Sequence, residues 1–401
     1  MLKKLIAVFL ILSLAFTVAS CGGNEPDADT TIPEPTQPAP ENLMDILDKD
    51  GAKIGEIDAR ASCTAMNGGI FYSVFELQDS QKTGNAYYRF YDTNSKQDVY
   101  LGTLEGQGYE AYFTRTELYG IIYTLAVVGA ADSDAPIKLM LLALDPGAGT
   151  MKTHVVSDNG FPYASMAVSN GKLLIMNHEM TQPRTDKVYA FDPANETITE
   201  ALSFSSATDS LRGVSAAKDG FYLLRLKINN GGENEMFLDR YDNGFGKVSE
   251  QSVNEALIKA TMEVHGIMSR QDALNELGMY LAGFSVEDGR YLFYENFGLT
   301  RVILDLQTGE AVLVKEDLYS LTVGSGAPYL YRMDFDPENV SEPEITGIVE
   351  GKLVQLDFKP AEPYKLIKDV SHSASGTWLV RASDGGSVMS STSVLYVWTE
   401  S

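Results

Sequence analysis

Side chains able to do acid–base or metal chemistry form no recognisable constellation in this sequence. The four histidines are His154, His178, His265 and His372, and no two have the spacing of a metal pair on a helix or strand. No Gly-x-Ser-x-Gly turn is present, and no glycine-rich phosphate loop follows a strand-like run. Paired carboxylates for glycoside cleavage are too easily found in an acid-rich chain to single one out. We therefore expect no metal and no cofactor, and assign no catalytic residue.

Five charged residues are the candidates for binding a ligand. They lie in or beside long segments that separate strand-like runs, and they are Glu179, Arg184, Arg332, Asp334 and Asp336. Loops held by rigid strands often carry binding groups, although solvated loop residues are the simpler interpretation of each. Tyrosine, with 21 copies, could add rings on which sugars stack, but its preference for strands explains most of that number.

The N-terminal segment predicts the cellular location of the protein. Lys3 and Lys4 precede a mostly apolar run over residues 5–18, which is shorter than the roughly 20 residues needed to span a bilayer. The sequence Val18-Ala19-Ser20-Cys21 resembles the lipobox of bacterial lipoproteins. That resemblance implies removal of residues 1–20 as a signal peptide and a lipid such as palmitate on Cys21, anchoring the chain to the extracytoplasmic face of the bacterial envelope. An ordinary secreted protein is the alternative.

Composition narrows the partners of the mature chain. Residues 21–42 contain five prolines and few large apolar groups, which predicts a flexible tether. Loss of residues 1–20, with two lysines and no acid, changes the net charge from −24 to −26. Such a charge argues against nucleic acid and against a second, electrostatic membrane contact. Cys63 is the one further cysteine, so we expect no internal disulfide, and we expect a monomer.

A repeat of about 51 residues organises residues 43–401. One recurring element is a tight turn between two β-rich runs, which is a strong hairpin signal when it contains Asn-Gly or Asp-Gly. It occurs at Asn67-Gly68, Asn170-Gly171, Asp219-Gly220, Asp288-Gly289, Gly326-Ala327 and Gly376-Thr377, and a turn at Thr116-Glu117 fits the series without a glycine.

The other recurring element is a strand that ends in aspartate before a polar turn, where the carboxylate can bond to the following backbone. It occurs at Asp92, Asp145, Asp192, Asp242, Asp305 and Asp357. Both turns together give four short strands per unit, which is typical of an all-β fold, the β-propeller. The segments 191–197 and 304–310 resemble quinoprotein-like propeller repeats. That resemblance implies a fold and no catalytic residues.

Counting units predicts seven four-stranded blades, with six or eight left open because residues 334–351 are hard to place. The last unit lacks an outer strand, so residues 52–58 are predicted to supply it and close the ring. The connections between second and third strands are long and should gather on one face, here called the long-loop face. Residues 252–277 predict an inserted pair of helices, either a hydrophobic cover over two blades or a lid.

Three functions follow from these observations. The favoured one is a membrane-anchored extracytoplasmic propeller that binds a protein or glycan ligand on its long-loop face without catalysis. An extracytoplasmic enzyme acting on polysaccharide, a glycosidase or lyase with carboxylates at the channel mouth, is the alternative. A scaffold subunit of an envelope assembly is the third.

Overall fold

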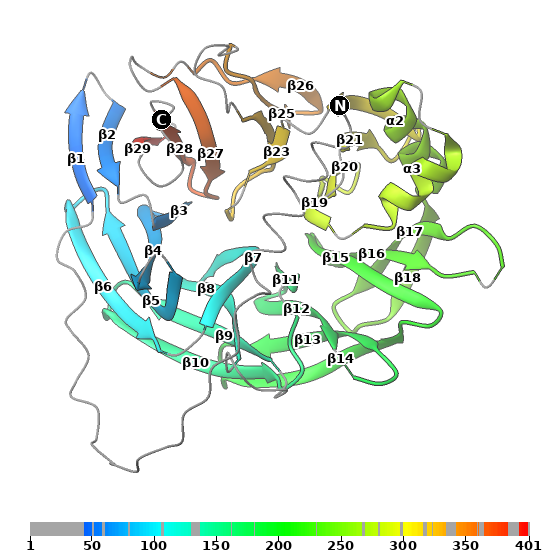
Figure 1. Ribbon diagram of the computed structural model, residues 1–401, viewed down its shortest axis with the longest axis horizontal. Helices are drawn as coiled ribbons and strands as arrows, with labels where there is room; N and C mark the ends of the chain where they lie inside the picture. Colours follow the sequence, from blue (N-terminus) through cyan, green and yellow to red (C-terminus); the bar gives the residue numbers. More distant parts are fainter. Residues whose placement is uncertain are drawn as a thin grey trace, which may run out of the picture. The chain divides into compact units, whose positions relative to one another are not determined.

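Seven antiparallel sheets arranged in a ring form the fold (Figure 1). The structure is a computed structural model. It describes residues 44–49, 52–57, 61–78, 81–105, 108–129, 137–161, 163–179, 181–229, 231–266, 269–279, 281–296, 300–315, 319–322, 324–333, 342–358, 360, 365–383 and 393–399. The predicted β-propeller with seven blades is therefore confirmed.

Each blade runs from an inner strand beside the central axis to an outer strand at the rim. Blades 1 to 3 comprise β3 (Ala61–Met66), β4 (Gly69–Gln78), β5 (Gln81–Asp92) and β6 (Gln97–Leu104); β7 (Gly108–Leu118), β8 (Ile121–Val128), β9 (Lys138–Asp145) and β10 (Thr150–Ser157); β11 (Ser165–Ser169), β12 (Lys172–Glu179), β13 (Thr185–Asp192) and β14 (Thr197–Ser205).

Blades 4 to 7 follow the same order. They comprise β15 (Asp209–Ala217), β16 (Gly220–Lys227), β17 (Glu235–Asp242) and β18 (Lys247–Ser252); β19 (Leu281–Glu287), β20 (Tyr291–Asn296), β21 (Arg301–Asp305) and β22 (Glu310–Lys315); β23 (Tyr319–Leu321), β24 (Tyr329–Arg332), β25 (Ile345–Val349) and β26 (Lys352–Gln355); β27 (Leu366–His372), β28 (Thr377–Ser383) and β29 (Ser393–Thr399).

The ring closes where the sequence predicted. Strand β2 (Ala52–Ile57) pairs antiparallel with β29, from Lys53 opposite Val397 to Ile57 opposite Ser393. A further strand, β1 (Met44–Lys49), pairs with β2 and makes this blade five-stranded, which the sequence analysis did not predict. The N-terminal strand thus completes a blade whose other strands come from the end of the chain.

Most of the predicted tight turns are confirmed, and two members are corrected. Gly326-Ala327 lies in a longer connection, because β23 ends at Leu321 and β24 begins at Tyr329. Asn67-Gly68 joins β3 to β4, and Gly68 adopts a φ of 79°, a left-handed conformation that glycine adopts without strain. The turn predicted at Thr116-Glu117 is wrong. Those residues continue β7, and the chain reverses at Tyr119-Gly120 with φ values of 55° and 77°. The second blade therefore has a turn glycine after all.

The aspartate-headed turns are confirmed in the first five blades. Asp92 is representative, because its Oδ1 accepts the backbone N–H groups of Asn94 and Ser95, each at 2.8 Å. The sixth member is wrong. Asp357 follows β26, the fourth strand, and the third strand β25 ends instead at a two-residue turn of Glu350 and Gly351, with φ values of 50° and 74°. Two left-handed residues reverse the chain there without an aspartate.

Hydrophobic clusters lie between neighbouring blades, one at each junction. Between blades 7 and 1 the cluster joins Cys63 and Tyr72 to Leu379, Leu395 and Val397. Because each blade faces a neighbour on both sides, consecutive residues of a middle strand can all be buried, as they are in β20. Packing between sheets, rather than a single centre, holds the ring together.

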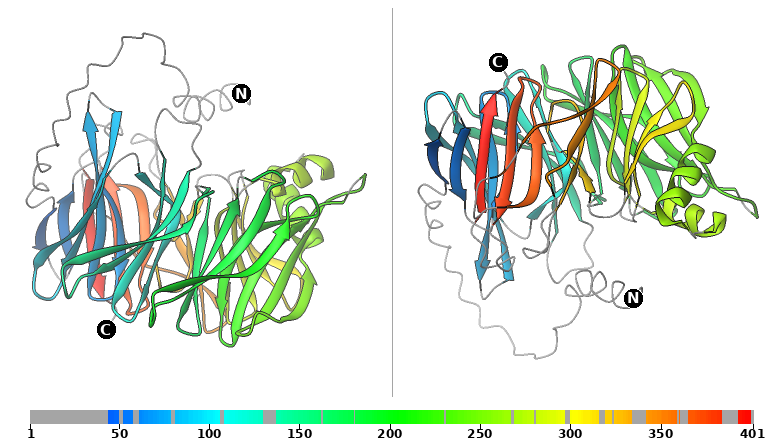
Figure 2. Two further views of the ribbon diagram at one scale, coloured as in Figure 1. Left: turned by 90° about the horizontal axis from the view of Figure 1, so that it is seen from below. Right: turned by 90° about the horizontal axis from the view of Figure 1, so that it is seen from above.

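The predicted helical insertion consists of α2 (Asn254–His265) and α3 (Arg270–Leu277). Ser269 caps α3 by accepting the N–H of Asp272, and Ser252, the first residue of the predicted insertion, ends β18. Leu257 and Leu277 join the cluster between blades 4 and 5, which supports the interpretation as a hydrophobic cover. Figure 2 shows the helices at the edge of the ring, toward one face.

Within the ranges that the structure describes, no helix combines the length and the apolar character needed to cross a membrane.

Candidate functional site

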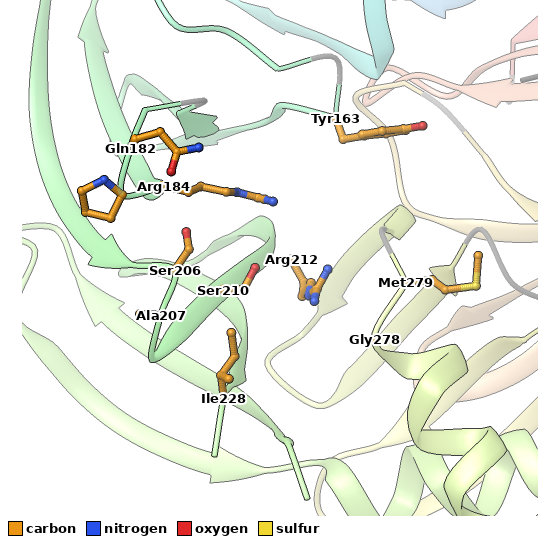
Figure 3. A pocket seen from close by; sticks show the side chains of 11 residues that line it. Tyr163, Gln182, Arg184, Ser206, Ala207, Ser210, Arg212, Ile228, Gly278 and Met279 are labelled. Atoms are coloured by element: carbon orange, nitrogen blue, oxygen red, sulfur yellow. The ribbon is translucent and has the colours of Figure 1, made fainter. Parts of the chain in front are cut away.

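A pocket of about 750 Å³ opens on the long-loop face where blades 3, 4 and 5 meet (Figure 3). Its walls come from the connections on this face and from the start of the inner strand β15. The lining residues are Tyr163, Gln182, Pro183, Arg184, Ser206, Ala207, Ser210, Arg212, Ile228, Gly278 and Met279. Its volume lies within the roughly 300–1,000 Å³ of small-molecule sites.

A wholly buried carboxylate, Asp186, organises the wall between blades 3 and 4. It sits at the start of β13, and it accepts the hydroxyl of Ser206 at 3.1 Å and the backbone N–H of Leu211 at 2.8 Å. Nδ1 of His178 lies 2.9 Å from its Oδ1, and Nε of Arg184 lies 3.6 Å from the same oxygen. The carboxylate of Asp186 thus contacts three segments that line the pocket: the β12–β13 loop, the β14–β15 connector and the inner strand β15.

The protonation states beneath the pocket follow from burial and hydrogen bonding. Burial disfavours the ionised form of Asp186, but the contacts with His178, the N–H of Leu211 and the nearby Arg184 outweigh it and hold its pKa below the usual range. Burial lowers the pKa of His178 despite its contact with Asp186. Asp186 is therefore charged at neutral pH, and His178 is neutral.

Two arginines are the charged groups among the described residues that line the pocket. Arg184 is the last residue of the β12–β13 loop, and its guanidinium carbon lies 5.6 Å from the centre of the Phe161 ring, a cation–π contact. Arg212 lies on β15, directly after Leu211. Figure 3 shows both side chains extending from neighbouring blades into the same space, with Tyr163 beyond them.

The structure separates the other residues predicted to bind a ligand. Glu179 ends β12 and is 6% exposed. Its carboxylate accepts the hydroxyl of Ser157 at 2.6 Å and that of Tyr189, and Nζ of Lys187 lies 3.3 Å away. Burial opposes ionisation of Glu179, yet these contacts lower its pKa, so this carboxylate ties blade 3 to blade 2 and does not line the pocket.

Arg184 is the only one of the five predicted residues placed in the lining of this pocket by the described part of the chain. Arg332 ends β24 in blade 6, does not line the pocket and is half-buried. Asp334 and Asp336 lie outside the described residues. The sequence analysis missed Arg212, Tyr163 and Ser206, because it considered the loops between second and third strands and not the connectors or the inner strands.

A second polar cluster crosses blades 5, 6 and 7 without lining this pocket. The hydroxyl of Ser320 donates to Glu295 at 3.0 Å, and the hydroxyl of Tyr331 donates to Asp369 at 3.2 Å. Burial raises the pKa of Asp369 to about 6, although the charge of Arg115 opposes the shift. Burial also raises the pKa of Glu295. These carboxyl groups link inner parts of neighbouring blades.

A smaller pocket, about 320 Å³, lies between blades 2 and 3 beside Tyr119 and Phe191. Its Lys152 and Glu196 form an ion pair with each other, so their charges cancel. This pocket therefore offers no net charge from that pair to attract a ligand.

The histidines occupy separate packing environments. His154 packs against Phe191 at a ring distance of 5.0 Å, and His372 stacks on Trp378 at 4.2 Å. The side chain of His265 lies outside the described residues. Across the described ranges, no group of three or more His, Cys, Asp or Glu residues has the geometry of a metal site.

Comparison with known proteins gives similarity of fold only. No family model and no curated protein matches the chain. Among solved structures, a chain of a mitotic checkpoint complex is 12% identical, covers 96% of this chain and 98% of its own, and has a TM-score of 0.48. The polysaccharide lyase Uly1 is 10% identical over 84% and 89%, with a TM-score of 0.47. An oligogalacturonate lyase in complex with manganese is 13% identical over 89% and 96%, with a TM-score of 0.46. At these values the comparisons assign no family and no activity.

Proposed function

We propose that this chain is a lipid-anchored, extracytoplasmic binding propeller that holds a protein or glycan ligand in the pocket between blades 3, 4 and 5. The observation that carries the proposal is the pocket itself. It combines donors and acceptors such as Gln182 and Ser210 with apolar walls such as Ile228, on a scaffold of strands. This combination is typical of sites that orient a ligand by a few polar contacts.

Binding without catalysis is the better supported of the two activities considered from sequence. Glycoside cleavage by carboxylates requires two such groups facing the ligand, about 5–9 Å apart. None of the described residues that line the pocket is acidic, and the carboxylate of Asp186 is engaged beneath its wall. The described lining therefore offers groups that hold a ligand, and no pair of carboxylates.

The binding proposal is tested with a tryptophan that fills the pocket. Ala207 is exposed and lines it, so Ala207→Trp should abolish binding of ligands found by screening the purified chain against glycans and envelope proteins. Ala216→Trp is the matched control, because Ala216 is an exposed alanine at the other end of β15. If every ligand binds both variants with the same affinity as the parent chain, the pocket is not the binding site.

The anchor is tested separately. Cells fed a clickable fatty acid should label the parent chain, and Cys21→Ala should remove the label because a cysteine thiolate accepts the lipid. Full labelling of the Cys21→Ala chain would refute the proposed lipid attachment and would leave the proposal for the pocket unchanged.

A further inference from the structure

The charge of the pocket opposes the charge of the chain. The chain carries a net charge of −24, whereas the charged residues among the described lining of the pocket are Arg184 and Arg212. Asp186, directly behind the wall, lies beside Arg184, with its Oδ1 3.6 Å from Nε. Both guanidinium groups are cations in the lining of a pocket on an otherwise acidic chain, and such groups attract an anionic group of a ligand.

The guanidinium group of Arg184 is held in place before any ligand arrives. Arg184 is fixed between the carboxylate of Asp186 and the ring of Phe161. The backbone that carries Arg212 is anchored to the same carboxylate, since Asp186 accepts the N–H of the preceding residue, Leu211. The contacts of Arg184 restrict the rotation that a flexible surface arginine would lose on binding, so less conformational entropy opposes capture of an anion.

We propose that Arg184 and Arg212 bind the single carboxylate of an acidic saccharide. This inference rests on the proposed function and specifies its ligand. A guanidinium donates two parallel N–H groups, which match the two oxygens of a carboxylate.

The remaining lining residues favour a saccharide over an acidic peptide. The amide of Gln182 and the hydroxyls of Ser206 and Ser210 can each donate and accept, as sugar hydroxyls require. Tyr163 adds an aromatic ring, which Figure 3 shows across the space from the arginines. An acidic peptide would bring several charges toward a chain of charge −24, whereas a sugar with one carboxylate brings one.

The test is calorimetric titration of the full chain in mild detergent. The probes are glucuronate, galacturonate and N-acetylneuraminate, with glucose, galactose and N-acetylmannosamine as neutral counterparts, and the dipeptide Ala-Asp and inorganic phosphate as other anions. We expect at least one sugar acid to bind tenfold or more tightly than its neutral counterpart. Arg184→Gln and Arg212→Gln should each weaken its binding at least tenfold and so remove its preference over the neutral counterpart.

Controls separate charge from folding. Arg290→Gln removes an arginine at the β19–β20 turn, where it pairs with Asp305, and should not change binding. Arg184→Lys and Arg212→Lys keep the charge without the planar pair of donors and should retain part of the affinity. Each variant is compared with the parent chain by its melting temperature, so loss of binding in a variant that melts normally is a local effect.

The outcomes also separate this inference from the proposed function. If Ala207→Trp abolishes the binding of a ligand and neither arginine substitution weakens it, the pocket is a binding site but the assignment of the arginines to a carboxylate is wrong. Tighter binding of Ala-Asp or phosphate than of every sugar acid overturns the inference as well. If Ala207→Trp affects no ligand at all, the proposed function fails with it.

Discussion

Removing the strand that closes the ring should expose a buried thiol at a distant point of the sequence. Strand β2 is the outer neighbour of β29, and β29 contributes Leu395 and Val397 to the cluster that buries Cys63. Cys63 is 2% exposed. A chain that begins at residue 43 lacks Cys21, so Cys63 is then its single thiol. Its rate of reaction with a thiol reagent reports opening between blades 7 and 1.

The size of the effect follows from the register of β2 against β29, which covers five residue pairs. A ladder of that length holds about five hydrogen bonds, each with a net contribution of roughly 0.5–1.5 kcal/mol. Deleting residues 43–58 should therefore lower the free energy of opening by about 3–7 kcal/mol. At about 1.4 kcal/mol per tenfold change, Cys63 should react at least a hundredfold faster when opening limits the reaction.

Deleting residues 43–50 alone is the matched control. It removes β1, which pairs with β2 over six residue pairs, and leaves β29 paired on both sides. Cys63 should remain protected in this shorter truncation even if its melting temperature falls. Equal thiol reactivity in all three chains would refute the role of β2 in closing the ring, and equal exposure by both truncations would show that closure depends on β1.

Three further outcomes follow from buried groups elsewhere. Asp186→Asn should lower the free energy of unfolding in urea by about 2–4 kcal/mol, because it removes a buried charge whose partners remain. The control Asp219→Asn changes an exposed residue and should lower it by less than about 0.5 kcal/mol. Equal losses in the two variants would contradict the structural role of Asp186. The raised pKa of Asp369, about 6 against an ordinary 3.8, means that the folded chain keeps a proton that the unfolded chain releases. The stability contributed by the protonated carboxyl group of Asp369 is fully present below the pKa of the unfolded chain, and it is lost as the pH rises through about 6. The free energy of unfolding of Asp369→Asn, relative to that of the parent chain, should therefore increase by about 1–3 kcal/mol between about pH 4 and pH 8. Urea titrations at both pH values measure this difference. If the difference does not depend on pH, the raised pKa of Asp369 is refuted. Trp378→Ala, at a fully buried ring stacked on His372, should cost about 3–5 kcal/mol in the same assay, and a loss below 1 kcal/mol would contradict the packing described.

The fold was predictable because its determinants are local. Turns such as Asn67-Gly68 and Asp92 with its following residues depend on a few adjacent side chains, and their recurrence counts the blades. The closure of the ring by β2 was predicted by counting strands, since the last unit had three of the four strands of a blade. The prediction failed in blade 6, because Asp357 matched the local pattern although Glu350 and Gly351 already made the turn.

The candidate site was less predictable because it is assembled from distant parts of the sequence. Arg184 was found because it lies in a long connection. Arg212 and Tyr163 were not, since one begins an inner strand and the other lies in a connector, and no spacing relates them. Glu179 lies at the boundary of the same long connection, but it ends β12 inside a set of buried partners, which the sequence pattern does not reveal.

The contrast between an acidic chain and a positively charged pocket predicts how salt should act on binding. Repulsion from a net charge of −24 acts over distance and is screened by salt, with a Debye length of about 10 Å at 0.1 M. For a single carboxylate, the contacts with Arg184 or Arg212 inside the pocket outweigh this distant repulsion, and salt weakens them too. A saccharide with one carboxylate should therefore bind somewhat more weakly as salt rises. A polyanionic chain should bind more tightly, because each of its other charges meets the repelling surface. Calorimetric titrations at about 0.05 M and 0.5 M salt distinguish the two, and affinity for a sugar acid that increases with salt would refute the attraction assigned to the arginines.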